Sequence, residues 1–233
     1  MDRNSEFLDL YRKLEMYLDG KYSYAESPVK EYIHKLEKSM VNKDKEKAAI
    51  IDFLRTMRNH IVHRNVSDYI EVTNKTIEFL NKEIAEFENP ILAEDIMTKI
   101  KDVYYVNLDT NTTDVLNEIY QNSYDIVPVL NNQNQVLGVF SLDVILNSIY
   151  KGELDKIQND SSISSFGELI SLNNQTKEKF AFVSSSTPLD ELVELFSKKE
   201  EKKLVMIFVT RDGLKISPLL GIITPHDIIN CKE

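Results

Sequence analysis

Two short segments of the chain carry side chains whose types and spacing could do chemistry. In the first, Arg58 is followed directly by Asn59 and, five positions after the arginine, by His63. An imidazole with an ordinary pKa of about 6.5 can act as a general acid or base, a guanidinium can stabilise charge on a phosphorane, and an amide can orient a phosphate oxygen. Together these groups could cleave RNA through its 2′-hydroxyl without a metal ion.

The second segment runs over residues 221–227 and reads Gly-Ile-Ile-Thr-Pro-His-Asp. A strand that ends at Thr224 and turns into a helix exposes the amides of the helix start, which together with the hydroxyl suit a phosphate. Asp227 lies about one turn further on, where its carboxylate could accept two hydrogen bonds from a ribose diol, and His226 could approach the phosphates. The same spacing also has a structural explanation, because Thr224 and Asp227 would form a capping box.

An earlier segment, residues 138–141, is a partial copy of this pattern. It reads Gly-Val-Phe-Ser, but the position that corresponds to Asp227 holds Val144, and the acid is Asp143. One residue corresponds to about 100° around a helix. We therefore expect Ser141 to cap the helix or contact a phosphate, and we expect ribose recognition by this copy to be lost.

The elements that must position these residues fall into two regions of different periodicity. Up to about residue 89, apolar residues recur at every third or fourth position, and neither proline nor glycine occurs between Pro28 and Pro90. This pattern predicts an all-helical region. The expected helices are residues 5–18, 27–40, 45–63 and 66–87.

The third of these helices carries the Arg58 segment. Its expected buried stripe lies within about 60° of arc on a helical wheel and consists of Ile50, Leu54, Met57 and Ile61. Arg58 and His63 are about 140° apart on the same helix. The two side chains would therefore meet only in a dimer that pairs these helices, or at a break near His63.

From residue 93 the pattern changes to short β-branched runs that alternate with amphipathic helices, in the order β-α-β-β-α, twice. The expected strands are residues 104–106, 125–130, 135–140, 180–183, 204–210 and 219–223. The expected helices are residues 112–120, 142–150, 188–198 and 225–230. The sequence thus predicts an α+β protein in which an all-α bundle (1–90) precedes a pair of repeats (91–233), the first at about 93–150 and the second at about 163–233.

The repeat resembles a tandem pair of CBS domains, the cystathionine β-synthase type of regulatory unit, also called a Bateman module. The resemblance rests on Asp95-Ile96-Met97-Thr98, on Ile126-Val127-Pro128-Val129 and on the two junctions that begin at Gly138 and Gly221. It implies two copies packed pseudo-symmetrically, pairs that dimerise, and an adenine nucleotide (AMP, ADP or ATP) or S-adenosylmethionine as a regulatory ligand that is sensed without being turned over. The residues that would bind this ligand are Thr224, His226, Asp227 and Ser141.

The Arg58 segment is similar to the R-x4-H motif of HEPN domains, small helical dimers that include metal-independent endoribonucleases and non-catalytic relatives. This resemblance implies that Arg58, Asn59 and His63 are catalytic. The alternative is that the three side chains only form hydrogen bonds across a dimer interface or to a neighbouring helix end. A domain that binds RNA without cleaving it fits the same residues.

The composition excludes several other classes of protein. The 6 glycines are too far apart for a G-x-G-x-x-G fingerprint or a phosphate loop. The net charge of −10 is opposite to the basic field typical of DNA-binding proteins, so we expect no DNA partner, and any RNA contact must be local. The single cysteine, Cys231, excludes a disulfide within the chain and a cysteine-rich zinc site, and we expect no metal.

The longest apolar run, residues 204–209, is too short to span a bilayer, and the first residues do not resemble a signal peptide. These observations predict a cytoplasmic protein without a membrane partner. The favoured interpretation is a ligand-sensing regulatory homodimer in which the CBS pair modulates a helical domain that acts on RNA. The alternatives are a HEPN-type endoribonuclease regulated by the CBS pair and a non-catalytic adaptor or dimeriser that docks a protein partner.

Overall fold

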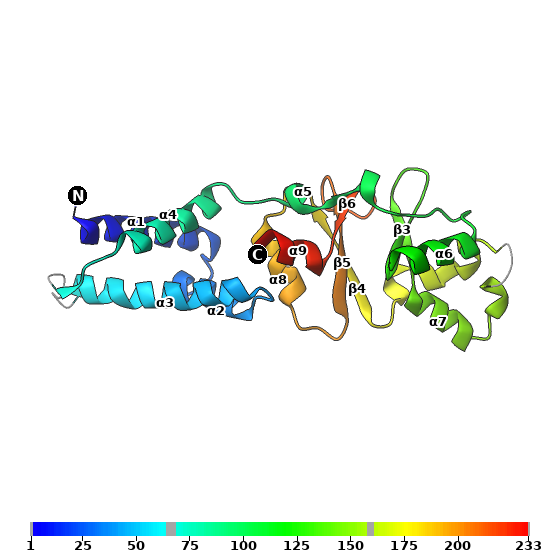
Figure 1. The fold of residues 1–233 in the computed structure, drawn as a ribbon, viewed down its shortest axis with the longest axis horizontal. Coiled ribbons are helices and arrows are strands. Elements are labelled where there is room, and N and C mark those ends of the chain that lie inside the picture. Colours follow the sequence, from blue (N-terminus) through cyan, green and yellow to red (C-terminus); the bar gives the residue numbers. More distant parts are fainter. Residues whose placement is uncertain (1, 64–68, 158–160, 233) are drawn as a thin grey trace. The chain divides into compact units, whose positions relative to one another are not determined.

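A computed structural model of the chain describes residues 2–63, 69–157 and 161–232 (Figure 1). The chain divides into two compact units. The first comprises Met1–Ile91, Pro188–Ser197 and Lys232–Glu233, and the second comprises Leu92–Thr187 and Lys198–Cys231.

The first unit is helical. Its helices are α1 (Arg3–Lys21), α2 (Pro28–Lys38), α3 (Asn42–His63), α4 (Asn74–Glu88) and α8 (Leu189–Ser197). Helix α1 lies beside α4, and α2 lies beside α3 (Figure 1). The core between them contains Phe7, Leu14, Ile51 and Leu80, all of which are fully buried. All four helices expected in this region are present.

The buried stripe of α3 differs from the expected one. Leu54 and Ile61 are buried, but Ile50 is 42% exposed and the neighbouring Ile51 is fully buried. The prediction that Ile50 is buried was wrong. Ile50 and Ile51 are neighbours in the sequence, and the helical wheel gives a different buried face depending on which of the two is assigned to the core. Ala48, which is buried, lies three residues before Ile51, and this 3–4 spacing sets the phase of the core face.

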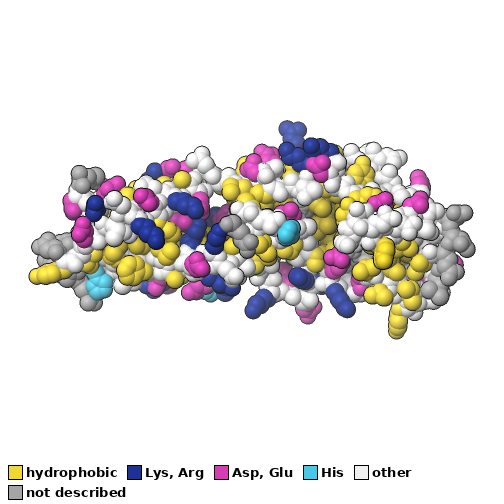
Figure 2. Space-filling model, viewed as in Figure 1, with side chains coloured by type: hydrophobic (Ala, Val, Ile, Leu, Met, Phe, Trp, Pro, Cys, Tyr) yellow, Lys and Arg dark blue, Asp and Glu magenta, His cyan; other side chains and the backbone are white. Residues whose placement is uncertain are grey.

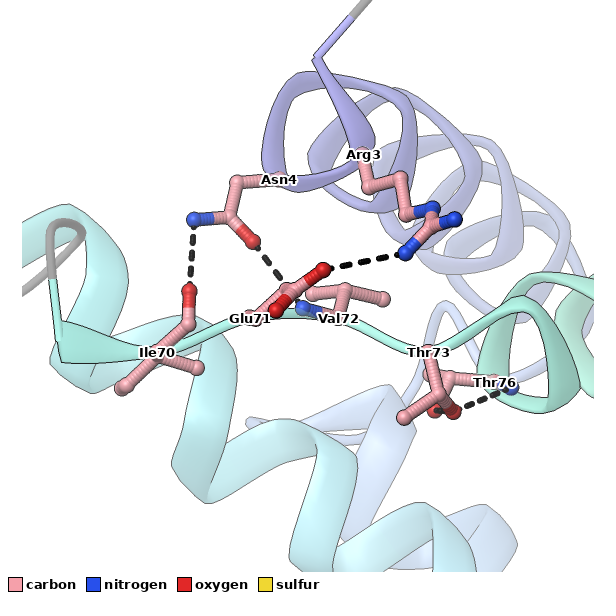
Figure 3. Close-up of polar contacts among 7 residues, drawn as sticks. All are labelled: Arg3, Asn4, Ile70, Glu71, Val72, Thr73 and Thr76. Carbon is pink, nitrogen blue, oxygen red and sulfur yellow. Dashed lines mark hydrogen bonds and ion pairs between the residues drawn. The ribbon is translucent and has the colours of Figure 1, made fainter.

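The fourth helix begins later than expected. The sequence pattern predicted a start at residue 66, whereas α4 begins at Asn74, and residues 64–68 lie outside the described part of the chain. The Asn4 side chain holds the segment before α4 in an extended form (Figure 3): its amide nitrogen donates to the Ile70 carbonyl at 2.8 Å, and its oxygen accepts from the Val72 amide at 3.3 Å. These two backbone groups therefore bond to α1 instead of to a helical turn.

The same close-up shows what starts α4 (Figure 3). The Thr73 hydroxyl accepts a hydrogen bond from the Thr76 amide at 3.3 Å, which is a helix N-cap. On the other side of the segment, Arg3 pairs with Glu71 at 3.1 Å. A local cap and a tertiary anchor thus define this boundary together.

The second unit contains the repeat. The helices and turns of the first copy are α5 (Ala93–Ile96), η2 (Ile100–Asp102), α6 (Thr112–Asn122) and α7 (Leu142–Tyr150), and its strands are β1 (Thr98–Lys99), β2 (Ile126–Leu130) and β3 (Val136–Ser141). After η3 (Leu154–Lys156) follow η4 (Ile163–Ile170), η5 (Leu172–Asn174), β4 (Glu178–Ser184), β5 (Lys203–Thr210), β6 (Leu219–Ile223) and α9 (Pro225–Lys232). By chain order α8 stands between β4 and β5, so the second copy has the expected order of elements, and the first copy has the expected helices and its last two strands.

The strands form one sheet in the order β1-β6-β5-β4 and a second sheet of β2 and β3. Strand β4 runs parallel to β5, with Val183 opposite Val209. The strand expected at residues 104–106 is absent as a strand: Val106 makes only a parallel bridge to Val129, through bonds to the backbone of Pro128 and Leu130. One copy therefore has a full parallel pair where the other has a single bridge.

In each copy, one glycine lies where two backbone segments cross closely. Gly138 in β3 has no room for a side chain, because a Cβ would overlap the carbonyl oxygen of Ile170. A Cβ at Gly221 in β6 would overlap the carbonyl oxygen of Thr98 in the same way. The segment that opens each copy thus lies on the closing strand of the other copy, and only glycine permits the approach.

No helix in the described ranges is both long and apolar enough to cross a membrane.

Candidate ligand-binding sites

The junction from β6 to α9 holds the strongest candidate site of the sequence. The Thr224 amide and the Thr224 hydroxyl both donate to Asp227 Oδ2, each at 2.7 Å. Of the capping box named above as a structural explanation, the bond from the Thr224 amide to the Asp227 carboxylate is therefore formed. These two bonds to Oδ2 fix the orientation of the Asp227 carboxylate at the N-terminus of α9.

The side chains at this junction are partly exposed to solvent. His226 is exposed, while Thr224 and Asp227 are half-buried. Pro225 is the first helical residue and has no N–H, so the amides of His226 and Asp227 are the first donors of α9 that the helix itself cannot satisfy. The structure thus brings Thr224, His226 and Asp227 together at one helix start.

The junction from β3 to α7 is built differently. Ser141 is 1% exposed, and no hydrogen-bond partner for its hydroxyl oxygen is found within the described ranges. Val144, at the position equivalent to Asp227, is buried. Asp143 instead accepts from the Thr176 hydroxyl at 2.8 Å and from the Thr176 amide at 3.2 Å. Asp143, which stands one residue too early to match Asp227, thus holds the segment that leads into β4.

Other polar side chains lie around this junction, and sequence reasoning did not find them. Gln175 is 1% exposed, and its Oε1 has no hydrogen-bond partner in the part of the chain that the structure describes. Glu178 Oε2 is also buried and has no hydrogen-bond partner among the described residues. Burial raises the pKa of Glu178, and the nearby carboxylates of Asp143 and Asp125 raise it further. We call Ser141, Asp143, Gln175 and Glu178 the acceptor cluster. The position of Asp143 was a signal in the sequence. It stands one residue before the position equivalent to Asp227, so its side chain has to face a different part of the protein.

The predicted catalytic residues of α3 are not brought together within one chain. The Arg58 guanidinium lies 3.5 Å from Glu15 in α1 and donates to the Asn59 side chain at 3.3 Å. Asn59 and His63 are exposed. Among the described contacts, none joins Arg58 to His63, and α3 is helical to its last residue. The geometry expected for a straight helix is therefore the one observed.

A buried hydroxyl lies next to these charges. Tyr11 in α1 is 1% exposed, and its hydroxyl has no partner among the atoms that the structure describes. Burial raises the pKa of Tyr11 strongly, and Glu15 adds to the effect, whereas Arg55 and Arg58 oppose it. Arg55 is itself paired with Asp52 at 2.8 Å. The charges around Arg58 are thus balanced in number, and the group is not a basic patch.

A metal centre finds no support in the described geometry. The His, Cys, Asp and Glu side chains of the described ranges form no group of three that could hold a metal ion.

Two copies with exchanged opening segments, each ending in a strand-to-helix junction, define a class of paired repeat. The CBS domain model matches residues 93–151 and again residues 176–232. These two stretches are CBS domains, and the second unit has the CBS-pair fold. The resemblance inferred from the sequence is confirmed for this part of the chain, while the likeness of the helical region to HEPN domains stays a prediction.

Solved structures of similar fold include AcuB from Vibrio cholerae, at 18% identity and a TM-score of 0.46, covering 62% of this chain and 91% of that one. A structure of CBSX2 in complex with AMP has 20% identity and a TM-score of 0.45, covering 60% and 95% of the two chains. The CBS domain pair of MJ0100, in complex with 5′-methylthioadenosine and S-adenosyl-L-methionine, has 17% identity and a TM-score of 0.41, covering 62% and 97%. A comparison with curated protein sequences found no match.

Proposed function

We propose that the CBS pair senses an adenine nucleotide at the β6–α9 junction and thereby regulates the helical unit. The observation that carries the proposal is the Thr224–Asp227 pair, in which a hydroxyl and a carboxylate lie together at an exposed helix start. Donors and a positive helix end suit phosphate, and a fixed carboxylate suits a ribose diol, so the junction has both parts of a nucleotide site.

Each residue of the junction has a distinct role in this proposal. The amides of His226 and Asp227 bind the phosphate, and Thr224, whose hydroxyl donates its hydrogen to Asp227 Oδ2, holds that carboxylate in place beside it. Asp227 Oδ1 accepts from the ribose, because Oδ2 already accepts both bonds from Thr224. The exposed imidazole of His226 lies beside the phosphate. Ser141 is the corresponding hydroxyl of the first copy. Nothing in these roles breaks a bond in the ligand, so the site is a sensor and not a catalytic centre.

Helix α8 supports the regulatory part of the proposal. It follows β4 and precedes β5 in the chain, yet its residues belong to the helical unit. Glu194 of α8 lies 2.8 Å from Lys35, and Asp190 pairs with Lys21. A helix that is continuous with the second CBS domain and ion-paired with α1 and α2 is a direct covalent route for a signal. We also place this sensor in the cytoplasm, where a chain with one cysteine keeps its thiol reduced.

We further propose that the protein is a homodimer. In the second unit, large apolar side chains of α6 and α7 face solvent (Figure 2): Tyr120 is 88% exposed, Leu146 63% and Tyr150 91%. In the first unit, Phe53 on α3 is 65% exposed. A second copy would remove such surfaces from water. Sedimentation of the wild type and of the Leu146→Lys and Phe53→Lys variants tests this proposal. We expect the dimer to dissociate in the variant whose substituted side chain lies in the interface. A monomeric wild type would contradict the proposal.

RNA cleavage is the second candidate function. The favouring observation is that Asn59 and His63 are exposed on α3 while Arg58 is oriented by Asn59, so two copies paired along α3 would place Arg58 of one beside His63 of the other. We expect RNA cleavage in EDTA that is lost in Arg58→Ala and in His63→Ala. Cleavage at an unchanged rate in both variants would exclude these residues, and a dimer without cleavage would leave the helical unit as an adaptor.

The nucleotide proposal is tested by thermal unfolding of the full chain with AMP, ADP, ATP and S-adenosylmethionine. A ligand at one hundred times its Kd adds about 2.7 kcal/mol to the free energy of unfolding. The increase in Tm with AMP, ADP or ATP is expected to vanish in Asp227→Ala and to persist in Asp114→Ala, which removes the acid of the first turn of α6. No increase with any of the four ligands would contradict the proposal.

A further inference from the structure

A band of lysines lies where strands β4 and β5 begin, and Lys and Arg side chains gather along this edge in Figure 2. The two strands are parallel and start at the same end, with Glu178 opposite Lys203. Lys179 pairs with Glu200, which holds the loop before β5 against β4. We call the band the lysine edge. Its members are exposed, apart from the half-buried Lys202, and they are Lys177, Lys179, Lys198, Lys199, Lys202 and Lys203.

The lysine edge is a positively charged surface on an acidic protein. Residues 177–179 and 198–203 contain six lysines and three glutamates, whereas the whole chain has a net charge of −10. Lys179 has its ion pair with Glu200, and the other five lysines of the edge have none among the described residues. Like charges that are held close together repel one another, so the band is favourable only when an anion faces it.

Protection of the sheet edge accounts for only part of the band. Strand β4 is the last in the order β1-β6-β5-β4, and lysines on such a strand prevent it from pairing with another chain. This explains Lys177 and Lys179. Lys203, however, belongs to β5, which is paired on both sides, and Lys198 and Lys199 lie between α8 and β5, outside the sheet. These three lysines require another explanation.

The surface around the lysines favours a nucleic acid over a protein partner. From residue 161 to residue 213, the described chain exposes no large hydrophobic side chain. Protein interfaces are anchored by aromatic and apolar side chains, and lysine is depleted in them. A nucleic acid carries its charge on the outside at every phosphate and needs only cations to bind it. The net charge of −10 repels a polyanion elsewhere, so the contact must be local.

We propose that the lysine edge binds the phosphate backbone of RNA. The inference rests on the RNA part of the proposed function and adds to it that lysines of the second CBS domain supply the affinity. Lys177, Lys199 and Lys203 are among those that contact phosphates. Lys202 donates to the Gln175 carbonyl at 2.7 Å and thereby holds the start of β5 on the segment before β4. Phosphate contacts carry no sequence information, so the edge binds RNA of any base sequence.

The test measures fluorescence anisotropy of a labelled single-stranded oligo(U) of about twelve nucleotides on titration with the full chain. Four phosphate contacts predict that the affinity falls about fiftyfold between about 50 and 200 mM salt. We expect the double variant Lys198→Glu/Lys199→Glu to bind about tenfold more weakly or worse. The matched control is Lys101→Glu/Lys151→Glu, which changes two exposed lysines of the same unit and the same amount of net charge, and it should bind as the wild type does.

Folding, cleavage and binding can be separated. Lys198 and Lys199 lie outside the helices and strands, so the double variant should unfold at the same temperature as the wild type, and Lys177→Gln serves as a second variant. Each phosphate contact that is removed should lower the slope of log K against log salt by about 0.7. Arg58→Ala and His63→Ala should bind RNA normally, so a failure of the cleavage proposal leaves this one testable.

Three results would each overturn the proposal. They are no binding of oligo(U) at low salt, an equal loss of affinity in the control variant, and binding of poly-glutamate as tight as that of the RNA, which would indicate an acidic polypeptide as the partner.

Discussion

Asp143 at the start of α7 accepts hydrogen bonds from both the amide and the hydroxyl of Thr176, which lies 33 residues further along the chain. In the second copy, Asp227 accepts the equivalent pair of bonds from Thr224, only three residues away. The same chemistry thus serves a tertiary link in one CBS domain and a local helix cap in the other. Local capping was predictable from spacing, and the tertiary link was not.

The Asp143–Thr176 link should contribute measurably to stability. Thr176→Val keeps the shape of the side chain and removes the hydroxyl that bonds to the carboxylate. We expect a loss of about 1 kcal/mol in the free energy of unfolding, measured by urea denaturation, because the acceptor is charged but the donor, Thr176, is exposed. Thr113→Val, at an exposed position of α6, is the control and should change stability by less than about 0.5 kcal/mol.

The two crossing glycines should tolerate no side chain. Gly138→Ala and Gly221→Ala each force a methyl group against a backbone carbonyl, so we expect each to cost about 1–3 kcal/mol or more in the free energy of unfolding. Gly20 in α1 has open space around it, and there the same substitution should stabilise the protein by about 0.5–1 kcal/mol. Three variants of equal stability would show that the crossings are looser than described.

Lys47 compensates a buried acid in the helical unit. Glu83 is 1% exposed and lies 2.8 Å from the Lys47 ammonium, and burial raises the pKa of Glu83 although Lys47 opposes the shift. We expect Lys47→Met to cost about 3 kcal/mol at neutral pH, because it leaves the carboxylate without its cation. Lys45→Met, at an exposed position of the same helix, should have little effect.

The cost of Lys47→Met should depend on pH with a definite sign. Without the ammonium, the pKa of Glu83 in the folded protein rises further above its value in the unfolded chain. An acid whose pKa is raised by folding loses stability as the pH rises from the unfolded pKa through the folded one. The difference between variant and wild type should therefore be small below the ordinary glutamate pKa and full near neutrality. Denaturation midpoints at several pH values check this, and a difference that is constant with pH would contradict it.

The Tyr11 hydroxyl should be dispensable for stability. It is buried without a described partner, so Tyr11→Phe removes a desolvated polar group and loses no hydrogen bond, and we expect a change between zero and a gain of about 1 kcal/mol. Tyr32→Phe is the matched control, because the Tyr32 hydroxyl donates to Glu83 at 3.2 Å. That variant should lose about 1–2 kcal/mol. A loss for Tyr11→Phe as large as that for Tyr32→Phe would mean that a water molecule satisfies the hydroxyl.

Much of the architecture was predictable from the sequence, because the repeat carries its order of elements in local patterns. The helix at residues 142–150 and the strand at residues 219–223 were predicted to the residue. Errors occurred where a distant contact decides: Asn4 holds residues 70–72 extended, and Val106 has a single bridging partner instead of a strand pair. Neither partner is close in sequence, so periodicity gives no sign of it.

The candidate sites were predictable to different degrees. Thr224 and Asp227 come together because they are separated by one helical turn, and spacing alone foresees this. The acceptor cluster assembles from segments on either side of the linker between the copies, and Gln175 and Glu178 belong to no motif. Arg58 and His63 show the converse, since their separation on one helix was foreseen and is observed.

The exchange of opening segments between the two CBS domains also determines how the pair can be taken apart. Cutting the chain in the linker near residue 157 would not release two domains that fold alone. The first fragment would keep β3 but lose the Ile170 segment that packs on it, and the second fragment would keep β6 but lose the Thr98 segment that pairs with it. Such fragments should fold only on mixing, as complementing partners. Although the pair is duplicated in sequence, we therefore expect it to unfold as one cooperative unit, so that a destabilising substitution in either copy lowers the stability of both.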